Sequence, residues 1–133
     1  MNNKIEQKLN KLIIKAKKNN EVPIACVITY KDRIIASAYN KVNNKNDIIN
    51  HAEVICLKKA TKKLNNWRLN ECNLYVTLEP CDMCKEIIKK YRINNVYYFV
   101  KQNNYKTESQ PNYIYRENKY YSNILKNFFK DKR

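Results

Sequence analysis

The chain has 133 residues and a formal net charge of +15, from 27 lysines and arginines against 12 aspartates and glutamates. This length suits one domain with a hydrophobic core, so we expect residues 1–133 to form a single domain. The positive charge would suit a nucleic-acid partner. However, glycine is absent and lysine is abundant, as in the product of an AT-rich coding sequence, so the charge alone does not indicate nucleic-acid binding. No apolar run could span a bilayer, and no signal-type apolar core follows the N-terminus; we expect a soluble, cytoplasmic protein.

The N-terminal part of the chain predicts a helix followed by a hairpin. The helix is expected to end near Asn19, because apolar residues recur at helical spacing before it: Ile5, Leu9, Leu12, Ile13 and Ala16. Strands are predicted over residues 23–30 and 34–40, with a turn at Lys31-Asp32-Arg33. Without glycine, asparagine is the next choice for left-handed positions, and Asn-Asn pairs mark the ends of periodic segments: 19–20, 43–44, 65–66, 94–95 and 103–104.

The middle of the chain predicts two helices with a strand between them. A polar loop is expected over residues 41–49, after which Asn50 can cap a second helix that runs to about Leu64. The third strand covers residues 74–78. A third helix follows, and its apolar spacing places Cys84 on the buried face together with Ile87, Ile88 and Tyr91.

The last part of the chain predicts two strands and a closing helix. The fourth strand, residues 96–100, is wholly apolar, and a short fifth strand covers residues 113–115. The closing helix, residues 120–133, carries an apolar stripe of Tyr121, Ile124, Leu125, Phe128 and Phe129. This order predicts an α/β fold, a three-layer αβα sandwich whose helices cover a mixed five-stranded sheet.

Two short motifs carry the most specific chemistry: His51-Ala52-Glu53 and Pro80-Cys81-Asp82-Met83-Cys84. A catalytic zinc ion typically takes three protein ligands and leaves its fourth position to water. His51, Cys81 and Cys84 meet that count, and Glu53 is then free to move protons. Both motifs lie at predicted helix N-termini, where the helix dipole lowers the pKa of a cysteine, so we expect both cysteines to bind as thiolates.

The same residues allow other interpretations. His51, the only histidine, could be an ordinary core or surface residue, and Cys81 and Cys84 could form a redox pair or half of a structural zinc site. A structural site usually has four protein ligands, and no second Cys-x-x-Cys is present. An odd total of five cysteines argues against a disulfide framework, and we expect the other three in the core: Cys26, Cys56 and Cys72. The two motifs together favour a catalytic zinc site.

The sequence resembles the bacterial tRNA-specific adenosine deaminases of the cytidine deaminase-like superfamily, from Val22-Pro23-Ile24 to Asn127-Phe128-Phe129. The likeness is strongest in Asn66-Trp67-Arg68-Leu69 and in residues 74–84, Leu-Tyr-Val-Thr-Leu-Glu-Pro-Cys-Asp-Met-Cys. The resemblance implies a homodimeric hydrolase that converts the wobble adenosine of a tRNA anticodon to inosine. It also implies one zinc ion per chain on His51, Cys81 and Cys84, Glu53 as proton shuttle, and Asn40 in contact with the flipped base.

The RNA-binding surface is expected at the end of the closing helix. There Phe129 offers an aromatic face to an unstacked base and Lys130 offers a cation to phosphate. The apolar surfaces of the second and third helices are the expected dimer interface. Two other functions stay open: a small-molecule deaminase acting on guanine, cytosine or cytidine, which would share the zinc motif, and a zinc-stabilised RNA-binding module without activity. The presence of Glu53 argues against the second.

Overall fold

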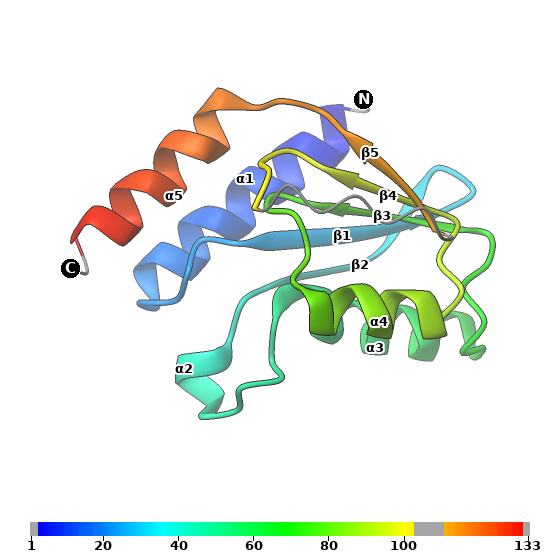
Figure 1. The fold of residues 1–133 in the computed structure, drawn as a ribbon. Helices are drawn as coiled ribbons and strands as arrows, with labels where there is room; N and C mark the ends of the chain where they lie inside the picture. The colour runs from blue at the N-terminus through cyan, green and yellow to red at the C-terminus, as the bar shows by residue number, and fades with distance from the viewer. Residues whose placement is uncertain (1–2, 103–110, 132–133) are drawn as a thin grey trace.

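A mixed five-stranded sheet separates two layers of helices in the computed structural model, which describes residues 3–102 and 111–131 (Figure 1). Within these residues the helices are α1 Asn3–Lys18, α2 Val42–Lys45, α3 Ala52–Leu64, α4 Asp82–Lys90 and α5 Lys119–Asp131. The strands are β1 Ala25–Tyr30, β2 Arg33–Tyr39, β3 Cys72–Val76, β4 Asn95–Tyr98 and β5 Asn112–Tyr115. The predicted αβα sandwich is therefore confirmed. None of the described helices has the length and apolar character needed to cross a bilayer.

The topology of the sheet decides where the helices begin. The strand order is β2-β1-β3-β4-β5; β1 is antiparallel to both of its neighbours, and β3, β4 and β5 are parallel. Strands β2 and β3 therefore run in the same direction on either side of β1, and their carboxyl ends lie at one edge of the sheet. Because α3 follows β2 and α4 follows β3, both helices start at that edge.

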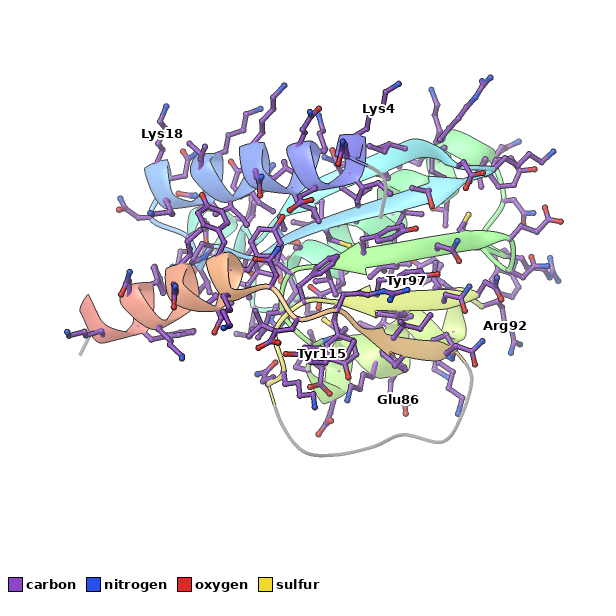
Figure 2. All side chains as sticks on the ribbon, turned by 90° about the horizontal axis from the view of Figure 1, so that it is seen from above. Lys4, Lys18, Glu86, Arg92, Tyr97 and Tyr115 are labelled. Atoms are coloured by element: carbon purple, nitrogen blue, oxygen red, sulfur yellow. The ribbon has the colours of Figure 1, made fainter. Side chains whose placement is uncertain are left out.

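Each face of the sheet is covered by two helices. Helices α3 and α4 pack on one face, over a core that includes Ile28, Leu57, Leu74, Ile88 and Val96. Helices α1 and α5 cover the other face, which Figure 2 views from their side, and bury Leu9, Ile13, Val27, Phe99 and Tyr121. The three cysteines that were predicted to be core residues are fully buried with free thiols: Cys26, Cys56 and Cys72.

The turns confirm only part of the predicted asparagine pattern. Asn20 and Asn65 adopt positive φ angles of 58° and 51° where α1 and α3 end. After α4, however, Arg92 takes the left-handed position with φ 67°, ahead of the pair at 94–95. The hairpin turn uses Lys31 and Asp32, both at positive φ, as a two-residue turn between twisted strands requires, and Arg33 already belongs to β2. The pair at 103–104 lies outside the described residues.

Two predicted features near the start of α3 were wrong. The expected polar loop over residues 41–49 contains the short helix α2, which holds the pair 43–44. The N-cap of α3 is His51 and not Asn50, because the backbone of His51 is extended and its carbonyl already accepts the first helical hydrogen bond, from Ile55 N at 3.1 Å. The fourth strand, predicted over residues 96–100, instead covers Asn95–Tyr98.

Candidate active site

The N-termini of α3 and α4 bring the two sequence motifs together. His51 is the N-cap of α3 and Cys81 is the N-cap of α4, both with extended backbone. Cys84 lies in the first turn of α4 and is fully buried. The ligand atoms of the three residues all lie within 4.8 Å of one another. Residues from two separate motifs thus form one cluster.

The spacing of these atoms fits a zinc ion. The Nδ1 atom of His51 lies 3.4 Å from Cys84 Sγ and 3.7 Å from Cys81 Sγ. In tetrahedral coordination, Zn–N bonds of about 2.0–2.1 Å and Zn–S bonds of about 2.3 Å place the two donor atoms about 3.6 Å apart. Across the described part of the chain the cluster offers these three ligands, which leaves a fourth tetrahedral position for water or substrate.

Burial governs the protonation of the cluster in the metal-free protein. It lowers the pKa of His51, which favours the neutral imidazole that metals bind. It raises the pKa of the Cys84 thiol, and negative charge on Glu53 and Cys81 adds to this effect. The pKa of Cys84 is therefore raised and not lowered as its place near a helix N-terminus predicted, because burial penalises the charged thiolate. A bound cation would oppose the desolvation by stabilising the thiolate.

Glu53 lies beside the cluster without belonging to it. It is in the first turn of α3, only 4% exposed, and its carboxyl group faces the same pocket as His51. Burial raises the pKa of Glu53 to about 7, against the opposing effects of hydrogen bonds from its own backbone N–H and from the Cys84 thiol. A carboxyl group with this environment can both accept and donate a proton near neutral pH.

A pocket of about 280 Å³ opens over Glu53 and the metal cluster. Pockets for drug-sized ligands span about 300–1,000 Å³. The volume here lies just below that range and therefore suits a small group such as a nucleobase. Its apolar lining consists of Val22, Ile24, Val42, Ile48, Leu78 and Phe129. Polar side chains also line it: Asn40, Asn43, Glu79 and Gln102. Figure 1 shows that α2 and the C-terminal end of α5 lie at the same end of the molecule.

The predicted substrate-binding residues lie in different settings. Asn40 follows β2 directly, is 5% exposed and lines the pocket. Phe129 lines the pocket as well, although 48% of its surface is exposed, and its ring packs edge-on against Phe128 with centroids 5.4 Å apart. Lys130 is exposed and is not a lining residue. The structure therefore brings Asn40 and Phe129 to the site and leaves Lys130 at its periphery.

A buried ion pair lies beside the pocket, which its glutamate, Glu79, lines. Lys85 Nζ lies 2.9 Å from Glu79 Oε2, and the two side chains are 9% and 6% exposed. The other carboxylate oxygen accepts a hydrogen bond from Gln102 N at 3.0 Å. This pair could not be predicted from the sequence, because a glutamate and a lysine six residues apart across a strand–helix junction match no periodic pattern. The pair fixes the chain after β4 against the pocket.

We expect Lys85→Met to lower the free energy of unfolding by about 3–5 kcal/mol, because it removes the cation that faces a buried carboxylate. Urea unfolding followed by circular dichroism would measure the change. Lys89→Met, at an exposed position of the same helix, is the matched control and should change stability little. A loss for Lys85→Met no larger than that of the control would contradict the structural importance of the pair.

Comparison with known proteins agrees with this arrangement. The MafB19-like deaminase family matches residues 1–133. The tRNA-specific adenosine deaminase of Buchnera aphidicola is 34% identical over 131 residues, with 89% of this chain and 87% of the relative covered. Matches to six other bacterial tRNA-specific adenosine deaminases span about half of each relative, 51–56%. A chloroplastic tRNA(adenine(34)) deaminase of Arabidopsis thaliana is matched over only 6% of its length.

Solved structures share the fold. One comes from a study of A-to-I editing by tRNA:A34 deaminases; it has a TM-score of 0.75 and 30% identity, and 84% of this chain and 95% of that one are covered. The guanine deaminase of Bacillus subtilis has a TM-score of 0.67 and 34% identity, with 76% of this chain and 66% of that one covered. The cluster, the pocket and these similarities agree with the resemblance seen in the sequence, and the chain belongs to the MafB19-like deaminase family of enzymes.

Proposed function

We propose that this protein hydrolytically deaminates the wobble adenosine of a tRNA anticodon to inosine, with one zinc ion held by His51, Cys81 and Cys84. The observation that carries the proposal is the clustering of three metal-ligand atoms within 4.8 Å of one another, beside a buried glutamate. The chain that holds this cluster is similar to a tRNA-specific adenosine deaminase over nearly its whole length. The substrate is proposed from the similarity to this relative, and the type of reaction is proposed from the geometry of the site.

When bound, zinc supplies a water molecule with a pKa near 7, so that a nucleophile is available at neutral pH. Glu53 would accept a proton from this water on a carboxylate oxygen and deliver it to N1 of the adenine ring as the water oxygen bonds to C6. Glu53 would then pass the second water proton to the departing amine, which leaves as ammonia. The atoms balance as adenosine plus water giving inosine plus ammonia.

The remaining pocket residues would receive the base. A flipped adenine would contact Asn40, which lies on the wall of the pocket, and would be enclosed by the apolar residues that exclude bulk water. Phe129 can stack on a neighbouring unpaired base, and Lys130 is placed next to it for contact with phosphate. Lys132 and Arg133, the two basic residues at the end of the sequence, lie outside the described residues.

Incubation of the purified protein with total tRNA, followed by sequencing, would test the proposed reaction. Inosine should form at wobble adenosines and should require the protein. Free guanine, cytosine and cytidine serve as parallel substrates, because the similar guanine deaminase structure keeps a small-molecule reaction as the alternative. Release of ammonia from a free base or nucleoside without inosine in tRNA would replace the proposed function with that alternative.

We expect Phe129→Ala to weaken binding of an anticodon stem-loop about 5- to 150-fold, since base–aromatic stacking contributes about 1–3 kcal/mol. Tyr120→Ala is the matched control, because Tyr120 lies on the same helix and is 54% exposed but does not line the pocket. Fluorescence anisotropy with a labelled stem-loop would compare the two. Equal binding by both variants would show that Phe129 does not contribute to RNA binding.

The homodimer implied by the resemblance, with α3 and α4 at its interface, stays a prediction, as does location in the cytoplasm. Sedimentation equilibrium at micromolar concentration would measure the oligomeric state. An active monomer would contradict the dimer and leave the proposed reaction intact.

A further inference from the structure

Glu21 is a buried carboxylate that the proposed reaction does not use. It follows α1 and is 0% exposed. Its Oε1 accepts a hydrogen bond from Asn43 N at 3.1 Å, and its Oε2 accepts one from Asn44 N at 2.7 Å. The side-chain nitrogen of Asn40 donates to the same Oε1 over a longer distance of 3.5 Å. One carboxylate thus caps the first turn of α2 and holds the side chain of Asn40.

The groups that Glu21 binds form one wall of the pocket. Asn40 and Asn43 line it, as do Val22 and Ile24, which follow Glu21 in the chain. Glu21 itself is not a lining residue, so it binds the residues of this wall on the side that faces away from the pocket. The backbone of Asn40 is anchored independently through a hydrogen bond from its N–H to Ile24 O at 3.1 Å. Glu21 therefore acts chiefly on the side chain of Asn40 and on α2.

We propose that Glu21 is a positioning residue for nucleoside recognition: it orients the Asn40 amide and fixes α2, and so sets the wall against which the target base lies. This inference rests on the proposed function. An ionised carboxylate can only accept hydrogen bonds, so the amide nitrogen of Asn40 must turn toward Glu21. Among the described residues the Asn40 Oδ1 accepts no hydrogen bond, and it remains available to a donor on the substrate.

Glutamine cannot reproduce this arrangement. Its amide would direct an NH₂ group either at the N–H of Asn44 or at the N–H of Asn43 and the side-chain nitrogen of Asn40, and donors would then face donors. In the first case the N–H of Asn44 loses its acceptor and the start of α2 would move, and in the second case the Asn40 amide would turn over. The pocket wall changes either way, while the volume of the side chain hardly changes. Glu21→Gln therefore separates positioning from packing, which Glu21→Ala alone would not do.

The test compares Glu21→Gln, Asn40→Ala and the double variant with the parent protein on an anticodon stem-loop. Asn40 would contact the base in the ground state and the transition state alike, so Glu21→Gln should raise KM about tenfold with kcat little changed. Zinc content should stay the same. Because Glu21 acts partly through Asn40, adding Glu21→Gln to Asn40→Ala should raise KM by less than Glu21→Gln does in the parent. Glu71→Gln, exposed at the far end of β3 from the site, is the matched control.

A second measurement does not depend on activity. The side-chain amide signals of Asn40 in a ¹⁵N-correlation spectrum, assigned by their loss in Asn40→Ala, should shift or broaden in Glu21→Gln and not in Glu71→Gln. Unchanged signals, additive effects on KM, or a lower Tm with normal KM would overturn the inference. If the parent protein forms no inosine, the proposed function fails, and the amide signals alone decide whether Glu21 orients Asn40.

Discussion

Glu53→Gln should keep zinc and the fold and yet reduce turnover of an anticodon stem-loop by about 10²–10⁴-fold or more. The carboxyl group is buried against the pocket and lies outside the three-residue metal cluster, so its loss removes proton transfer without removing a ligand. Because Glu53 would move protons in more than one step, we expect the upper end of this range. Glu53→Ala should behave in the same way.

Single-turnover kinetics on the stem-loop would measure the chemical step, and metal analysis would verify one zinc ion per chain. Glu86→Gln, at an exposed position of α4, is the matched control and should retain parental rates. A rate for Glu53→Gln within tenfold of the parent would contradict its assignment as the proton shuttle. Loss of zinc from this variant would instead indicate that Glu53 is itself a zinc ligand.

The features that could be predicted from the sequence are those with a local signal. Helical spacing of apolar residues located α1 and α5, and alternating or wholly apolar runs located the strands, because burial of one face imposes these periods. Cys81 and Cys84 lie on one helical turn, and His51 and Glu53 share another, so each motif could be found by its spacing alone. The two motifs meet because β2 and β3 run in the same direction, and no local sequence pattern indicates the direction of a strand.

The features that could not be predicted depend on contacts between distant segments. Helix α2 is capped by Glu21, more than twenty residues earlier, so nothing within residues 41–49 distinguishes it from a loop. The raised pKa of the Cys84 thiol likewise reflects burial by the whole fold, whereas the sequence shows only its place near a helix N-terminus. Asn40 was assigned through the family resemblance, and its orientation by Glu21 appears only in the structure.

Cys84→Ala should abolish zinc binding and deaminase activity together. Cys84 is fully buried and is one of the three residues of the cluster, so among the described residues the variant leaves only His51 and Cys81 there. Cys72→Ala is the matched control, because Cys72 is also a fully buried cysteine but lies outside the cluster. The control should lose packing energy and keep zinc. Loss of zinc from Cys72→Ala would indicate a fourth protein ligand and hence a structural site.

Zinc should also contribute to stability, since it binds the folded chain far better than the unfolded one. At a free zinc concentration 100 times the dissociation constant, this linkage amounts to about 2.7 kcal/mol. A chelator should therefore lower the Tm of the parent and of Cys72→Ala, and it should leave the Tm of Cys84→Ala unchanged. Because the hydrophobic cores on the two faces of the sheet include none of the three metal ligands, the loss should be partial and not global unfolding. Complete unfolding on chelation would contradict this expectation and would mean that the chain needs the metal in order to fold, as at a structural zinc site.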